Sequence, residues 1–494
     1  MSKSKTSSYI VTLQLHTQLY QEYILNKRFN IARQIYNCCL NELYKRYNLM
    51  RESKQYQYIC KLPKSTNRNK LFKDLNVKFG ITEYSLHDYI KPMQKYFKKN
   101  IDSFTAQKIA TRAYNTFQKL LFHKAKKVKF KKYGGLNSVE GKSNRTGIMY
   151  RDGYIIWNGL RIPIIIKKND IYAQKAIQDR IKFCRIKREI IKGKYHYYAQ
   201  LVLEGIPPKK INNETGEIIG GIGQGNVGID IGTQTIAYSS QYDVGLKELS
   251  PETNGIDKQL RLLQRKMDRS KRVMNPNKYN TNGTINTKNK DKWIFSNHYI
   301  KIRNIRKELY RKQREIRKQS HYKLINYLLS LGDTFYVEDM NYKGLQSKSK
   351  KAIKNKNGKF NKKKRFGKSL GNKAPSMFLT ILNQKLRYNN NELNKINTVK
   401  VKASQYNHMT GEYKKKKLSE RWNYFNIDGE EIKIQRDLYS SFLIMNVKDN
   451  LKEIDQDKCF KTFNNFKKMH DIVINELGYI KNKDNKRIIS SMGI

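Results

Sequence analysis

The sequence is short of paired cysteines and holds no long apolar run. Its five cysteines are odd in number and form no C-x-x-C pair, which excludes a thiolate metal site and indicates reduced core residues. No apolar stretch approaches the roughly 20 residues that cross a bilayer, and the first residues are not followed by the apolar segment of a secretory signal. We therefore expect a soluble cytoplasmic protein with no membrane partner.

Acidic residues are also scarce, because 41 Asp and Glu face 101 Lys and Arg, a formal net charge of +60 over 494 residues. A chain of this length is expected to form several domains, since single cores rarely grow beyond about 250–300 residues. Any one basic run could be a solvated face, but the cations are spread over the whole length. Self-repulsion on this scale points to a polyanionic partner, and we expect a long nucleic acid in the nucleoid.

In the first half of the chain, the predicted secondary structure changes from helices to strands near residue 146. Residues 9–15 are rich in β-branched and aromatic side chains and predict a strand, whereas the spacing from about 20 to 125 predicts helices. Asp152-Gly153 is a two-residue hairpin signal, and residues 186–191 and 195–203 predict two more facing strands. Residues of roughly 146–205 are thus expected to form a small antiparallel sheet or barrel, which the strand at 9–15 completes.

The second half predicts an α/β arrangement. The expected strands are residues 227–232, 235–239, 244–249, 334–340 and 398–402, and the expected helices are 256–273, 296–331, 375–386 and one from about 434. The long helix at 296–331 repeats cations over several turns, as a helix lying along a nucleic acid does. A Lys-rich flexible loop is expected at 343–373, an irregular segment at 404–432, and an amphipathic helix in the tail, whose apolar stripe runs from Phe463 to Leu477.

Two glycine patterns resemble phosphate-binding loops. Residues 223–228 match G-x-G-x-x-G, but a dinucleotide site requires a helix after the glycines, and here a strand is predicted. Residues 135–143 resemble a P-loop with one residue too many in the gap, so the backbone cradle would not close. A plain glycine-rich loop is the better interpretation of both.

Three acidic residues lie in unexpected surroundings. Asp230 and Glu338 each sit in a strand that is otherwise apolar, and Asp437 opens an amphipathic helix. A buried carboxylate is costly without a cationic partner, and a cluster of three is stable mainly around hard divalent cations, Mg²⁺ or Mn²⁺. Two such ions would activate a water and stabilise the leaving oxygen of a phosphodiester.

Simpler interpretations of the same acids stay open. Asp437 alone could be a helix cap, since Asp is favoured at helix starts. Glu338 and Asp339 are adjacent in one strand and point to opposite faces, so only one of them can join the site. The other would bind a neighbouring helix or loop.

Three stretches resemble the RuvC motifs of TnpB, the transposon-encoded RNA-guided nuclease, and of the related type V CRISPR effectors. They are V-G-I-D-I-G-T at 227–233, Y-V-E-D-M-N-Y-K-G-L at 336–345 and R-D-L-Y-S-S-F-L-I-M-N-V at 436–447. The resemblance implies an RNase H-like core with Asp230, Glu338 and Asp437 as catalytic, Mg²⁺-binding acids. It also implies a guide RNA and cleavage of double-stranded DNA beside a short motif, which is read within the first 205 residues.

The resemblance also implies an α/β multidomain layout in which a small wedge-like β-barrel, with a helical recognition domain inserted, precedes the nuclease core. The barrel would comprise residues 1–20 and 146–221, and the recognition domain 21–145. The RuvC-like domain would comprise residues 222–403 and 433–450, interrupted by an insert at 404–432, and a basic tail would follow at 451–494. We expect a monomer.

The sequence departs from the family at the insert, where a four-cysteine zinc ribbon is usual. Asn407 and Thr410 stand in place of the first cysteine pair, and Phe425 and Asp428 in place of the second. Without thiolates a structural zinc is not expected. We predict a metal-free remnant held together by Trp422, Tyr424 and Phe425.

The sequence thus predicts an RNA-guided DNA endonuclease of the TnpB type. A compact type V CRISPR effector would have the same chemistry and differ in the source of its guide RNA. A guided DNA-binding repressor that does not cut is the alternative from another class, although all three acids are present.

Overall fold

The structure, a computed structural model of the chain, describes residues 6–212, 215–253, 256–347, 366–417, 419–427, 429–483 and 492–494. The start of the chain at 1–5, Asp428 and most of the expected Lys-rich loop lie outside the described residues. The chain divides into two compact units, Met1–Asn213 and Glu214–Ile494. Within the described ranges, no helix is long and apolar enough to span a membrane.

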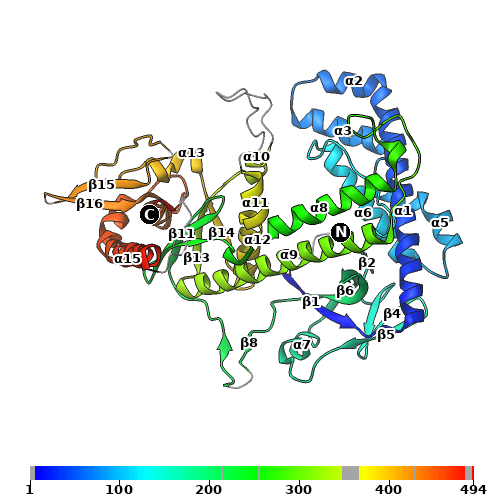
Figure 1. Cartoon of the computed structure of the whole chain (residues 1–494), viewed down its shortest axis with the longest axis horizontal. Coiled ribbons are helices and arrows are strands. Elements are labelled where there is room, and N and C mark those ends of the chain that lie inside the picture. The colour runs from blue at the N-terminus through cyan, green and yellow to red at the C-terminus, as the bar shows by residue number, and fades with distance from the viewer. Residues whose placement is uncertain are drawn as a thin grey trace. The chain divides into compact units, whose positions relative to one another are not determined.

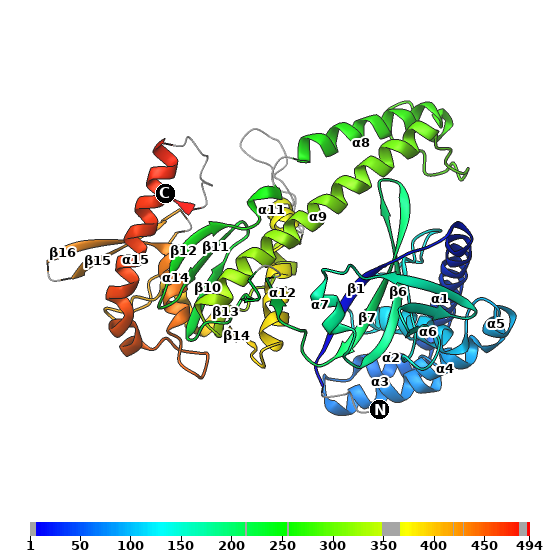
Figure 2. The ribbon, with the colours of Figure 1, turned by 90° about the horizontal axis from the view of Figure 1, so that it is seen from below.

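The first unit contains a seven-stranded antiparallel sheet with the order β2-β6-β7-β1-β5-β4-β3 (Figure 2). Its strands are β1 (Ser8–Leu15), β2 (Ser138–Glu140), β3 (Met149–Arg151), β4 (Tyr154–Trp157), β5 (Leu160–Ile165), β6 (Ile181–Ile191) and β7 (Lys194–Glu204). The strand expected at 9–15 is confirmed, and it lies in the middle of the sheet, paired with both β5 and β7. Alternate residues of β1 are buried, so one face of the strand packs into the core.

Two-residue turns fix the register of this sheet. The expected hairpin at Asp152-Gly153 is confirmed, and both residues have the positive φ that this tight connection requires. Asn158-Gly159 and Lys192-Gly193 turn in the same way. The Asn158-Gly159 turn leads into β5, a strand that was not predicted.

Helices pack against one another beside this sheet (Figure 1). They are α1 (Leu19–Glu52), α2 (Lys54–Lys61), α3 (Thr66–Lys78), α4 (Glu83–Tyr89), α5 (Lys91–Tyr96) and α6 (Ser103–Leu121). The short helix α7 (Ile171–Ala176) lies apart from them and contacts the short strand β8 (Lys210–Ile211), which follows the sheet. The buried guanidinium of Arg28 in α1 donates hydrogen bonds to the backbone of Trp157 and Asn158, at 2.5 and 2.7 Å, and lies over the indole ring. Helix α1 is thereby fixed to the end of strand β4.

The second unit is built on a five-stranded mixed sheet with the order β12-β11-β10-β13-β14 (Figure 2). Its strands are β10 (Asn226–Ile231), β11 (Thr235–Ser239), β12 (Val244–Glu248), β13 (Thr334–Glu338) and β14 (Leu393–Ile396), after the short β9 (Ile218–Ile219). Strands β10, β13 and β14 are parallel, and β11 and β12 are antiparallel to their neighbours. The expected strands at 227–232, 235–239, 244–249 and 334–340 are confirmed.

One expected strand is wrong. Residues 398–402 contain the short helix α13 (Thr398–Val401), and the strand lies just before it, as β14. The side chain of Asn397 accepts hydrogen bonds from the backbone N–H groups of Val399 and Lys400. This helix cap outweighs the β-branched alternation that suggested a strand.

Helices cover both faces of the sheet (Figures 1 and 2). Helices α9 (Asn297–Leu331) and α12 (Pro375–Arg387) share one core with Ile229 and Val337, whereas α14 (Arg436–Met445) and α15 (Gln456–Lys483) share the other with Tyr336 and Ile396. The predicted tail helix is α15, and its apolar stripe packs into that second core. The remaining elements are α8 (Ile256–Val273), α10 (Tyr342–Leu345), α11 (Gly367–Lys373), η1 (Pro251–Thr253), η2 (Pro276–Lys278) and η3 (Ala403–Gln405).

The insert is more regular than predicted. Strands β15 (Trp422–Ile427) and β16 (Glu430–Gln435) form an antiparallel hairpin that runs directly into α14. Helix α14 begins at Arg436 and not near Ile434, because Gln435 accepts a hydrogen bond from the N–H of Leu438 and caps the helix.

The packing of the insert corrects the predicted aromatic anchor in part. Phe425 is buried as expected, and the indole N–H of Trp422 donates to the carbonyl of Gly493 at 3.1 Å. Tyr424 is 58% exposed and holds nothing in place, so its predicted role is wrong. The missed anchor is His408, which is fully buried among aromatic rings, with its Nδ1 2.6 Å from the hydroxyl of Tyr439.

We predict that stability falls in acid because of two buried histidines. Burial lowers the pKa of both His321 and His408 to about 4, below the value of roughly 6.5 in an unfolded chain. Their contribution is therefore complete above about pH 6.5 and is lost as the pH falls toward 4, by about 1.4 kcal/mol per pH unit for each histidine. Urea unfolding at pH 7.5, 6.0 and 5.0 measures the slope.

The histidine variants separate this effect from other titrations. His321→Phe, which keeps a ring against Phe378, should flatten the slope by about one histidine's share. His298→Ala removes an exposed ring and should leave the slope unchanged. Equal slopes in the wild type and His321→Phe would contradict the assignment.

A second prediction concerns Gly228, where helix α14 contacts strand β10. A Cβ atom at this position would overlap backbone atoms of Ser441 and Met445. Gly228→Ala should lower the free energy of unfolding by about 1–3 kcal/mol, the usual cost of overpacking. In Gly371→Ala, the added Cβ meets no described atom within 4 Å, and we expect a change below about 0.5 kcal/mol in the same urea titration.

Candidate functional site

The two strand acids lie side by side at the carboxyl ends of parallel strands. Ile229 of β10 pairs with Val337 of β13, so Asp230 and Glu338 follow as the next residues in register. Side chains alternate along a strand, and Ile229 and Val337 both face the α9 core. Asp230 and Glu338 therefore both face α14.

The third acid comes from that helix. Asp437 lies in the first turn of α14, and Gln435, not Asp437, is the residue that caps it. The carboxylate of Asp437 accepts hydrogen bonds from the guanidinium of Arg436 at 3.2 Å, and Arg421 lies 3.8 Å from its other oxygen. Asp437 is thus held between two arginines at the end of the helix that covers Asp230.

The charges of Glu338 and Asp437 both act on Asp230. The pKa of Asp230 is raised well above its usual value, first by burial and then by the negative charges of Asp437 and Glu338, while Arg436 opposes the rise. Burial also raises the pKa of Glu338. The three residues that the sequence singled out are thus half-buried, and the charges of the other two repel that of Asp230.

The register also resolves the choice between Glu338 and Asp339. Asp339 follows the end of β13 and pairs with the ammonium group of Lys395 at 2.9 Å. Both of these side chains are largely exposed. Glu338 is the acid that belongs with Asp230, and the partner of Asp339 is a residue of the adjacent strand rather than of a helix or loop.

Three residues beside the acids were not predicted as part of the site. The hydroxyl of Tyr342 donates to the carbonyl of Ile231 at 3.4 Å, and its pKa is raised by burial and then by the charges of Asp230 and Glu338. Arg421 and Arg436 are the others. Only Arg436 could have been found from the sequence, because this cation stands directly before the acid that it pairs with.

The carboxylates suit a hard divalent cation by their chemistry, but they are not arranged around one. Among the residues that the structure describes, no group of three or more His, Cys, Asp or Glu side chains is placed so that it could hold a metal ion. The two arginines instead balance the charge of Asp437. A bound Mg²⁺ would have to compete with them for that carboxylate and would relieve the repulsion that raises the pKa of Asp230.

Comparison with known proteins assigns no family to the chain. No protein-family model and no curated protein sequence matches it. A cryo-EM structure of a Cas12f1–sgRNA–target DNA complex matches with 11% identity over 89% of this chain and 98% of that chain, at a TM-score of 0.36. A cryo-EM structure of a CRISPR-Cas12f ternary complex matches with 13% identity over 87% and 82%, at a TM-score of 0.26.

We predict that neutralising Asp230 stabilises the metal-free protein. Because the carboxyl pKa is raised in the folded state, ionisation of Asp230 favours unfolding, and the contribution of this one residue to stability should decline as the pH rises from about 4 through the raised pKa. Asp230→Asn removes this loss. In EDTA at pH 8 the variant should be more stable than the wild type, because the neutral amide carries no charge that burial and the neighbouring acids oppose.

Thermal unfolding with and without Mg²⁺ completes this test. Mg²⁺ should raise the melting temperature of the wild type and leave that of Asp230→Asn unchanged, because the variant lacks one ligand. Glu392→Gln, at an exposed carboxylate that pairs with Arg387, should behave like the wild type in both respects. A less stable Asp230→Asn protein in EDTA would show that Asp230 is not a repelled buried charge.

Proposed function

We propose that the chain is a metal-dependent, RNA-guided DNA endonuclease of the TnpB type. The observation that carries the proposal is the shared environment of Asp230, Glu338 and Asp437, in which each of the other two charges raises the pKa of Asp230. Clusters of perturbed carboxylates are typical of functional sites, and these three occupy the positions that resemble the RuvC motifs.

Each part of the site has a distinct role in this proposal. Asp230, Glu338 and Asp437 hold Mg²⁺ or Mn²⁺, which when bound activates water and stabilises the leaving oxygen of the phosphodiester. Tyr342 closes the site on the side of the strand ends, because its buried ring lies by both strand acids. Arg436 and Arg421 hold the Asp437 carboxylate in place by their ion pairs until a cation takes it over.

The charge of the chain supports a long nucleic acid as partner. Helices α8 and α9 pack together as a basic arm, in which Arg303, Arg306 and Lys307 are among the cations of α9 (Figure 2). Such a surface binds the phosphate backbone of an RNA–DNA heteroduplex, and base pairing with the guide RNA selects the double-stranded DNA target. The protein would act as a monomer.

A guided DNA-binding protein that does not cut is the second candidate. The arginine pairing of Asp437, together with the lack of a preformed cation site among the described residues, favours this alternative. A compact type V CRISPR effector differs from the main proposal only in the origin of its guide, which sequencing of the copurified RNA identifies.

Cleavage by the purified protein with its copurified RNA tests the proposal. A plasmid library with randomised flanks, matched to the sequenced guide, is incubated with Mg²⁺ and the cut ends are sequenced. We expect cuts beside one short motif, and Asp230→Ala, Glu338→Ala or Asp437→Ala should each reduce the rate by about 10³-fold or more, since each removes a ligand of the catalytic cation.

The controls separate loss of chemistry from loss of binding. Glu392→Ala removes an exposed acid of the same unit and should cut at the wild-type rate. The three acid variants should retain their RNA. Tight target binding by the wild type without any cut product would refute the nuclease and favour the repressor.

A further inference from the structure

A pocket of about 410 Å³ opens beside the acid site, at the same edge of the sheet. Ile396, which lines it, pairs in register with Glu338, and both Ile396 and Leu451 pack toward the α14 core. The pocket thus lies one strand away from Glu338, at the carboxyl end of β14, with Ile396 on the face of Glu338 and Lys395 on the opposite face. Crevices at the carboxyl ends of parallel strands are common places for ligands in α/β proteins.

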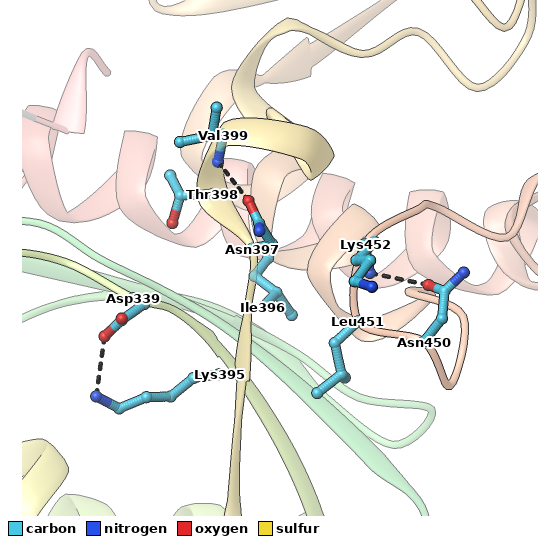
Figure 3. A pocket seen from close by; sticks show the side chains of 9 residues that line it. All are labelled: Asp339, Lys395, Ile396, Asn397, Thr398, Val399, Asn450, Leu451 and Lys452. Carbon is cyan, nitrogen blue, oxygen red and sulfur yellow. Dashed lines mark hydrogen bonds and ion pairs between the residues drawn. The ribbon is translucent and has the colours of Figure 1, made fainter. Parts of the chain in front are cut away.

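The walls of the pocket come from two segments that are distant in the sequence. Figure 3 shows Asp339 and Lys395 on one side and the loop of Asn450 to Lys452 on the other, with Asn397 between them. A hydrogen bond of 2.9 Å from the N–H of Asn397 to the carbonyl of Leu451 joins the two segments. The pocket is therefore a feature of the folded unit and not a gap between loose loops.

The lining combines the groups that recognise a nucleotide. Lys452 and Lys395 bring ammonium groups, and the negative charge of Asp339 is already paired with Lys395. The Nδ2 groups of Asn397 and Asn450 can donate to a base edge or a sugar hydroxyl, while their Oδ1 atoms already accept backbone N–H groups, and Val399 and Leu451 add apolar surface. A phosphate on Lys452 and a base or sugar against the amides would use each kind of group.

We propose that this pocket holds one nucleotide of the single strand that is delivered to the acids. The inference rests on the proposed function and deepens it, because it names where the strand is held beside the bond to be cut. A nucleotide fixed here places its neighbouring phosphodiester toward Glu338, since Ile396 and Glu338 are paired neighbours. The shared chemistry is a nucleoside monophosphate unit, supplied by a DNA or an RNA strand.

Photocrosslinking of the full-length protein, with its copurified RNA, tests the pocket directly. Single-stranded oligonucleotides carrying 4-thiothymidine, or 4-thiouridine in the RNA arm, are irradiated with the protein in EDTA, so that no cutting is needed. Crosslinked peptides are identified by mass spectrometry. We expect crosslinks within residues 395–399 and 450–452, and the arm with the higher yield identifies the strand as DNA or RNA.

Charge reversal provides the matched comparison. Lys452→Glu should lower the crosslink yield at these peptides about five- to tenfold, because one phosphate contact is replaced by repulsion. Lys400→Glu reverses an exposed lysine on α13 that does not line the pocket, and it should change the yield less than twofold. Equal losses in both variants, or crosslinks confined to other peptides, would overturn the proposal.

The experiments give different results if the nuclease proposal fails than if the pocket proposal fails. If no DNA is cut but the crosslinks and their loss in Lys452→Glu persist, the pocket binds a strand and the catalytic assignment is wrong. If cutting occurs and Lys452→Glu crosslinks like the wild type, the nuclease proposal holds and the pocket proposal fails. Both lysines are exposed, and thermal unfolding of each variant checks that the fold is intact.

Discussion

The repulsion that two half-buried carboxylates exert on Asp230 is the constraint on which the second unit depends. Asp230 is covered by a helix that itself carries an acid, and the pKa of Asp230 shows that burial and the two neighbouring charges act in the same direction. The close approach of α14 to β10 is possible because residue 228 is glycine and leaves room for the helix backbone. Arg436 and Arg421 offset part of the repulsion from the side of Asp437. The unit thus accepts an electrostatic cost at the place where its packing is tightest, as functional sites commonly do.

The two faces of the mixed sheet differ in polarity, because one is an apolar core and the other carries the acids. The face toward α9 and α12 is apolar along both central strands and makes a conventional core. On the face toward α14, Gly228 of β10 lies beside Tyr336 of β13, and the next side chains on that face are Asp230 and Glu338. The polarity of this face therefore increases toward the carboxyl ends of the strands. The acids, Tyr342 and the pocket all lie near this one edge. A one-residue shift of β13 against β10 would put Asp339 in the place of Glu338. The pairing register of the two strands therefore decides which of the two acids lies beside Asp230.

The features that the sequence predicted well are those with a local cause. The apolar strands around Asp230 and Glu338, the Asp152-Gly153 turn and the stripe of the tail helix follow from periodicity and turn chemistry. Strand β14 was missed because Asn394 and Lys395 interrupt its apolar residues, and α13 was mistaken for a strand because a side-chain cap overrode β-branched residues. The candidate acids were identified from pattern and resemblance, but their pairing with Arg421 and the role of His408 depend on contacts between distant segments, which periodicity does not encode.

The order of the elements along the chain has a consequence for biosynthesis. Strand β10 ends at residue 231, whereas the helix that covers it begins at residue 436, so the face that carries Asp230 stays open while about two hundred further residues are translated. Domains generally fold as their last segments leave the ribosome, at about 5–20 residues per second. The basic α8–α9 arm emerges within that interval, well before Asp437 does. Under the proposed function, the nascent chain would therefore meet RNA near its own ribosome before all three acids have been translated, so that assembly with RNA would precede any cutting.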